Sequence, residues 1–143
     1  RGFFGISQKL PLKQGLWLLR SWPMVRGMSI VMTKSREPKL RRWVHAQHDA
    51  NFNDFASRTV AIEGYLASTS HNVGEYAPHF TGPTLLITGA LDDITSPKQQ
   101  REMAATINAP HRLIEHPGVG HLTHYEIPGL VAADIDEFLK ALP

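Results

Sequence analysis

The chain has 143 residues, of which 42% are hydrophobic and 20% charged, the composition of a globular domain. It has no cysteine, no run of about 18 apolar residues and no secretory signal, which excludes disulfides and thiol chemistry and predicts a cytoplasmic protein without a transmembrane segment. Because the chain begins at Arg1 and not at Met, the absence of a signal excludes little.

The net charge of +2 hides a split, because residues 1–42 carry +9 and the remaining residues carry −7. Such asymmetry can mark a basic surface for anionic partners. We attribute it instead to a further segment that balances the charge, and we expect no nucleic-acid partner. The basic cluster "KLRR" is interpreted as a solvated helix face.

The first 70 residues have helical patterns and no strand alternation. Pro11 and Pro23 punctuate apolar and Met-rich stretches, which predicts two or three short helices before residue 34. Ser35 as N-cap and Pro38 in the first turn then predict one long helix, or two that join near residues 51–53.

Residues 71–82 form a polar connector, after which strands alternate with helices. "PTLLITG" (83–89) is a short apolar run closed by glycine, typical of a strand buried on both faces, and "HRLIEH" (111–116) is a second strand. Between them, Ser96 and Pro97 predict the start of a helix that continues through Ala105.

The last predicted element is an amphipathic helix in residues 126–142, with an apolar face of Leu130, Val131, Ile135, Phe138 and Leu139. The alternation of strands and helices predicts an α/β fold with a parallel sheet. Two strands cannot form an independent sheet of this kind, so residues 83–143 are expected to be the end of a larger domain.

Two loops carry the chemistry. "GALDDITSP" places Asp92 three residues after Gly89, and "GVGHLTH" places His121 after the second strand. Loops at the carboxyl ends of parallel strands lie at one edge of the sheet. A histidine base needs a carboxylate on its second ring nitrogen, so Asp92 and His121 are the candidate acid and histidine of a triad.

The segment "PTLLITGALDDITSP…EHPGVGHLTHYEIPGLVAADIDEFL" resembles the C-terminal part of the α/β-hydrolase superfamily, in its esterase, lipase, proline-iminopeptidase and carbon–carbon-hydrolase branch. The resemblance implies residues 83–143 as the C-terminal part of the catalytic domain, with two strands of its parallel sheet and their helices. It implies an all-helical cap or lid in residues 1–70, joined through the connector 71–82. It also implies that Asp92 is the triad acid and His121 the triad histidine.

A hydrolase of this kind needs no cofactor and acts on a small, partly apolar ester, amide or related carbonyl substrate. Under a helical cap, Trp17, Trp22 and Met28 are candidates to contact that substrate, although such residues also serve simply to pack amphipathic helices. We expect the chain by itself to be inactive.

The nucleophile is the missing member, because no G-x-S-x-G elbow occurs in the chain. The nearest match, "GMSIV" around Ser29, lacks the second glycine and a preceding strand. In the family the elbow and the oxyanion loop precede the cap, so the expected partner of this chain is a missing N-terminal half of the same fold. Two alternatives stay open: an Asp-nucleophile hydrolase of the haloalkane dehalogenase or epoxide hydrolase type, and a non-catalytic binding protein or inactive fragment.

Other residues could fill the roles assigned to Asp92 and His121, or could bind a metal. Asp93 is an alternative acid one residue on, and His124 is interpreted as a loop residue near the site. The eight histidines invite a metal site, but neither His45 with His48 nor His111 with His116 has a strong metal-ligand spacing, so no metal site is predicted.

Overall fold

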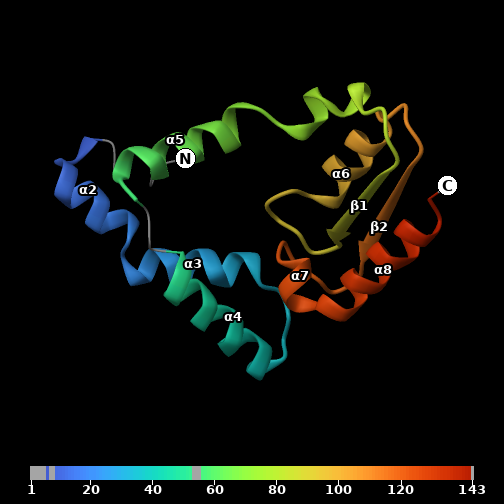
Figure 1. The fold of residues 1–143 in the computed structure, drawn as a ribbon. Coiled ribbons are helices and arrows are strands. Elements are labelled where there is room, and N and C mark those ends of the chain that lie inside the picture. The colour runs from blue at the N-terminus through green and yellow to red at the C-terminus, as the bar shows by residue number, and fades with distance from the viewer. Residues whose placement is uncertain (1–5, 7–8, 53–55, 143) are drawn as a thin grey trace. The chain divides into compact units, whose positions relative to one another are not determined.

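The protein is described by a computed structural model that covers residue 6, residues 9–52 and residues 56–142 (Figure 1). The chain divides into two compact units. The first comprises residues up to 30 together with 42–72, and the second comprises 31–41 together with 73–143. The predicted division into cap, connector and catalytic part remains a prediction.

The first unit is helical. It contains α2 (Leu12–Leu19) and α5 (Arg58–Ser70), together with most of α3 (Trp22–Met32) and of α4 (Pro38–Asn51). Two helices, and not one, therefore occupy residues 38–70. Ser57 is the N-cap of α5, and its side chain accepts a hydrogen bond from the Val60 backbone N–H. Residues 53–55 lie outside the described residues.

The predicted capping of α4 by Ser35 is wrong. The Glu37 carboxylate accepts the backbone N–H groups of Lys39 and Leu40, in the first turn of α4. The Ser35 hydroxyl instead accepts the Glu37 backbone N–H at 3.2 Å. Helix starts leave several N–H groups unsatisfied, and Glu37, placed directly before Pro38, has both the reach and the charge to satisfy two of them.

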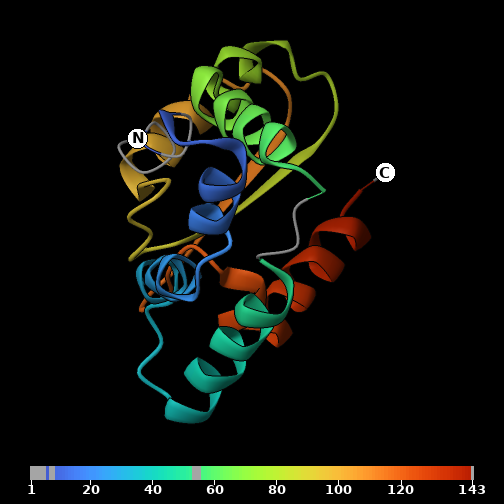
Figure 2. The same cartoon turned by 90° about the vertical axis from the view of Figure 1, so that its left-hand side faces the viewer.

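The second unit contains the predicted α/β pattern. Two short 3₁₀ helices, η1 (Val73–Glu75) and η2 (Ala77–His79), precede β1 (Thr84–Gly89), α6 (Pro97–Ala104) and β2 (His111–His116). The strands are parallel, in register from Thr84 opposite His111 to Gly89 opposite His116, which confirms the predicted parallel sheet. Figures 1 and 2 show α6 and α8 (Pro128–Lys140) on opposite sides of this two-stranded sheet.

Sequence signals placed α6 and β2 well. Ser96 is the N-cap of α6 and forms a capping box with Gln99, and Pro97 occupies the first helical position. The four-residue helix α7 (Thr123–Glu126) was not predicted. It is too short to show a helical period in the sequence.

The expectation that β1 is buried on both faces is not met by this chain. Only Thr88 and Gly89 are buried, and the other four residues of β1 are half-buried. On α8, Val131 and Phe138 are half-buried, while the remaining apolar side chains of its predicted face (Leu130, Ile135 and Leu139) are exposed. Two strands and two flanking helices leave sheet and helix surface uncovered. No helix within the described residues is long and apolar enough to span a bilayer.

Candidate active site

The acid loop and the histidine loop are joined by backbone hydrogen bonds at the end of the sheet. The Ala90 N–H donates to the His116 carbonyl at 2.8 Å, and the Leu91 N–H donates to the Val119 carbonyl at 2.9 Å. The Asp92 N–H then turns back to the Gly89 carbonyl at 3.1 Å. These bonds place the residues that follow β1 against those that follow β2.

Gly89 permits this close approach. A Cβ at position 89 would lie 2.3 Å from the Gly120 carbonyl oxygen and 2.4 Å from that of Val119, so any other residue would push the two loops apart. Gly118 adds the turn, with a φ of 74°, in the left-handed region that favours glycine. The glycines of both motifs thus set the spacing between Asp92 and His121.

Asp92 and His121 are in direct contact. The Asp92 Oδ2 atom lies 2.9 Å from Nδ1 of His121, within hydrogen-bond distance. The Asp92 side chain is 4% exposed and that of His121 is 30% exposed. A buried carboxylate therefore holds one ring nitrogen of a histidine whose side chain stays partly exposed.

The Asp92 carboxylate is held by further donors. Its Oδ1 atom accepts the backbone N–H groups of Ile94 at 2.8 Å and Thr95 at 3.0 Å, and its Oδ2 atom accepts the Thr95 hydroxyl at 2.7 Å. Burial by itself raises the pKa of Asp92, but the hydrogen bonds from His121, Thr95 and Ile94 together outweigh it, and the pKa lies below its ordinary value. Asp92 is therefore ionised at neutral pH.

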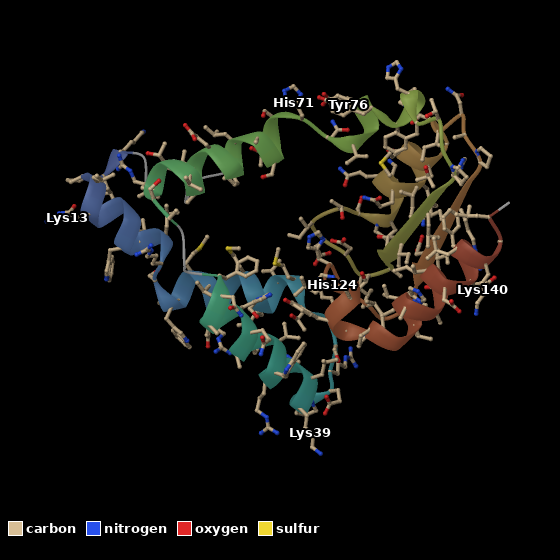
Figure 3. The ribbon with its side chains drawn as sticks, in the orientation of Figure 1. Lys13, Lys39, His71, Tyr76, His124 and Lys140 are labelled. Atoms are coloured by element: carbon tan, nitrogen blue, oxygen red, sulfur yellow. The ribbon has the colours of Figure 1, made fainter. Side chains whose placement is uncertain are left out.

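Asp93 and His124, the competing acid and base, lie apart from this contact. Asp93 is paired with the Lys34 ammonium at 2.5 Å, and its side chain is 67% exposed. His124 lies on α7 (Figure 3) and is exposed, with its ring tilted against that of Tyr125 at a centroid distance of 4.5 Å. The structure thus brings Asp92, and not Asp93, to His121.

Ser29, the weak nucleophile candidate, belongs to α3 in the first unit. Its side chain is fully buried, and its hydroxyl lies 2.5 Å from Nδ1 of His45 on α4. A hydroxyl without exposed surface cannot meet a substrate in this conformation. The Ser29–His45 contact ties two helices of the unit together.

The three predicted substrate contacts also lie on helices of the first unit. Trp17, on α2, is 72% exposed, and Trp22, on α3, is 61% exposed. The Arg26 guanidinium lies over the Trp22 ring at 5.3 Å from its centroid, and Met28 is half-buried. Asp92 and His121 belong to the second unit, and a substrate role for these three side chains stays a prediction.

The histidines considered as metal ligands have other surroundings. Burial lowers the pKa of His48, and nearby His45 lowers it further, against the opposing effect of Asp49. Nε2 of His116 lies 2.6 Å from an Asp134 oxygen, and Nδ1 of His111 lies 3.0 Å from the Ala109 carbonyl. The described part of the chain contains no group of three or more metal-ligating side chains.

Two residues of the site were missed by sequence reasoning. Thr95 donates both its N–H and its hydroxyl to Asp92, and its position three residues after an aspartate in a Gly-bounded turn is the signal that was available. Glu126 is 8% exposed, and one of its oxygens accepts the Gly120 backbone N–H at 3.0 Å.

Solved structures resemble this chain over nearly its whole length. The chain matches an esterase from Exiguobacterium antarcticum with a TM-score of 0.72 and 16% identity, over 98% of this chain and 47% of that one. An enol-lactonase from Burkholderia xenovorans matches with a TM-score of 0.73 and 19% identity, over 97% and 49% respectively. A thermophilic esterase from Thermogutta terrifontis matches with a TM-score of 0.71 and 19% identity, over 98% and 48%.

This chain has the α/β-hydrolase fold. It spans about half the length of the structures that it matches, which fits a C-terminal portion of the fold. No protein-family model and no curated protein matches the sequence. At this level of identity the likeness concerns the α/β-hydrolase fold and not the substrate.

Proposed function

We propose that this chain supplies the acid and the histidine of a hydrolase for ester, amide or related carbonyl substrates. The observation that supports it best is the 2.9 Å contact between the buried Asp92 carboxylate and Nδ1 of His121. The two residues lie in loops at the same end of parallel strands, in a chain with the α/β-hydrolase fold. A neighbour with that fold is an esterase and another is an enol-lactonase, which favours acyl-transfer chemistry.

In the proposed reaction Asp92 acts through His121. Its negative charge holds the imidazole with the proton on Nδ1 and stabilises the imidazolium that forms during turnover. Nε2 takes the proton of the nucleophile hydroxyl as that oxygen attacks the substrate carbonyl. It then gives the proton to the leaving group, and water hydrolyses the resulting acyl-enzyme by the same route.

We infer that the nucleophile and the oxyanion loop come from a segment that precedes this chain in the same fold. The uncovered strand and helix surface and the roughly half coverage of the matched structures support this inference. Residues 1–70 are proposed as a helical cap segment, with Trp17, Trp22 and Met28 as candidate contacts of a small, partly apolar substrate. Serine is the proposed nucleophile, and no cofactor takes part in the proposed steps.

The test uses the protein extended upstream through its own reading frame, assayed with p-nitrophenyl esters. His121→Ala should lower kcat by about 10⁴–10⁶, as loss of a triad member does, while His124→Ala should cost little. The same contrast is expected between Asp92→Asn and its neighbour control Asp93→Asn. Equal losses from the two histidine substitutions, or an active enzyme with His121→Ala, would refute the proposal.

A further inference from the structure

Glu126 is a buried carboxylate whose hydrogen bonds, within the described residues, all come from backbone N–H groups. Its side chain comes from the end of α7, and the residue is 8% exposed. One oxygen accepts the N–H of Gly120 at 3.0 Å and that of Lys34 at 3.1 Å, and the other accepts the N–H of Ser35 at 2.5 Å. Hydrogen bonds to an ionised acceptor are the stronger kind, and an ionised carboxylate can accept all three.

These three bonds join the histidine loop to the segment 32–35, which belongs to the same unit. Gly120 directly precedes His121, and the His121 N–H itself donates to the Met32 carbonyl at 3.1 Å. The backbone around His121 is therefore tied to this segment twice, once directly and once through Glu126. The Lys34 ammonium also pairs with Asp93, next to Asp92, so the segment contacts the acid loop as well.

Gly120 provides the room for this arrangement. A Cβ at position 120 would lie 2.9 Å from the Glu126 Oε1 atom and 2.7 Å from the Met32 carbonyl oxygen. The Gly120 carbonyl oxygen also lies close to Gly89 at the end of β1, 2.3 Å from where a Cβ at position 89 would be. The loop that carries His121 is thus packed between the acid strand on one side and the Glu126 carboxylate on the other.

We propose that Glu126 is a positioning residue for His121: its carboxylate holds the loop at the place where Nδ1 meets Asp92. The inference rests on the proposed function. The hydrogen bond from Gly120, the residue before His121, is the route by which Glu126 acts on the loop. A purely structural Glu126 would contribute to stability but leave the state of the His121 ring unchanged, and that difference can be measured.

The first experiment measures the His121 ring by NMR in the upstream-extended protein. Nitrogen-15 spectra report which ring nitrogen carries the proton, and a low-field proton signal reports an Nδ1–H that donates to a carboxylate. Wild type should show the Nδ1–H form. Glu126→Gln should shift His121 toward a mixture of tautomers and weaken the low-field signal. A glutamine amide has only one acceptor oxygen, and its NH2 group would face a backbone N–H that also needs an acceptor.

The variants form a series with a control. Glu126→Ala, which removes every acceptor, should have a larger effect than Glu126→Gln. Glu126→Asp keeps the charge but is shorter, and it should restore part of the Nδ1–H form. Glu137→Gln is the matched control, because Glu137 is an exposed glutamate of the same unit that pairs with Arg112. Folded Glu126 variants with the wild-type tautomer and low-field signal would overturn the proposal.

A measurement on the unmodified chain keeps the proposal testable if the variants do not fold. The amide protons of Gly120, Lys34 and Ser35 should exchange with solvent much more slowly than those of exposed loops. Exchange as fast as in an exposed loop would show that Glu126 does not hold the loop, and the proposal would fail.

Kinetics on the upstream-extended protein separates this inference from the proposed function. Glu126→Gln should lower kcat by about 10–100-fold with KM little changed, as loss of the outer partners of metal-ligating histidines does. If His121→Ala abolishes turnover and Glu126→Gln leaves kcat unchanged, the positioning role fails and the hydrolase proposal stands. If the NMR series behaves as expected but no hydrolysis occurs, the proposed function fails while the positioning geometry stands.

Discussion

At the scale of single residues, the site depends on how one carboxylate is kept ionised in a buried place. Burial removes water from the Asp92 carboxylate, which disfavours its charged form. Hydrogen bonds donated by His121, Thr95 and Ile94 replace that water and stabilise the charge. The sequence indicated Asp92 and His121 through their spacing from glycines. The local spacing of Thr95 from Asp92 was an available signal that was missed. The role of Glu126 left no such signal, because its hydrogen bonds to Lys34 and Ser35 join segments about 90 residues apart in the sequence.

The lowered pKa of Asp92 predicts how stability depends on pH. The group binds protons less readily in the folded protein than in the unfolded one, so it stabilises the fold above its unfolded pKa of about 3.9, and this contribution is lost as pH falls through the lower folded value. Urea unfolding of wild type and Asp92→Asn between pH 3 and 7 should therefore show a difference in unfolding free energy that shrinks toward the acidic end.

A second variant tests the cause. Thr95→Val removes one of the hydrogen bonds that lower the folded pKa of Asp92. The acid-dependent loss of stability should begin near the unfolded pKa in both proteins, but in this variant it should end at a higher pH and be smaller in total. Parallel curves for wild type and Asp92→Asn across the whole range would show that Asp92 has the same pKa in both states.

At the scale of elements, local signals decided what could be predicted. Ser96 and Pro97 marked the start of α6, and the apolar run closed by glycine marked β1, since caps and strand ends depend on adjacent residues. Ser35 failed as a cap because two candidate acceptors stand close to Pro38, and only the fold decides that Glu37 reaches the free N–H groups. Burial of β1 could not be predicted, since it depends on neighbouring strands.

The capping box of α6 gives a prediction at this scale. Ser96→Ala removes the acceptor for the Gln99 N–H and should lower the free energy of unfolding by about 0.5–2 kcal/mol, measured by urea titration. Ser68→Ala is a suitable control because Ser68 is exposed and its hydroxyl donates to the Tyr65 carbonyl within α5, so its effect should stay within about 0.5 kcal/mol. Equal effects would mean that the box does not stabilise α6.

At the scale of the whole molecule, two observations concern surface rather than site. Most of β1 is half-buried, three residues of β2 are exposed, and α8 exposes three large apolar side chains. The charge is divided between a basic N-terminal stretch and an acidic remainder. Both fit a chain whose fold is shared with proteins about twice its length. The sequence indicated the incomplete sheet by counting strands, which is a matter of topology and did not require side-chain detail.

The proposal of a preceding nucleophile segment leads to a labelling prediction. The 143-residue chain by itself should not react with a serine-directed fluorophosphonate, because its one serine with a partial elbow pattern, Ser29, is fully buried against His45. The upstream-extended protein should be labelled once, at a serine before Arg1, and His121→Ala should abolish that labelling, because the base that activates the serine is then missing. Mass spectrometry of peptides from both proteins identifies the labelled residue.

Stoichiometric labelling of the 143-residue chain, at Ser29 or at any other serine, would place the nucleophile within this chain and would rule out the missing-half interpretation. An extended protein that hydrolyses esters without any labelled serine would instead point to an aspartate nucleophile, and the roles proposed for Asp92 and His121 would then apply to a different covalent intermediate.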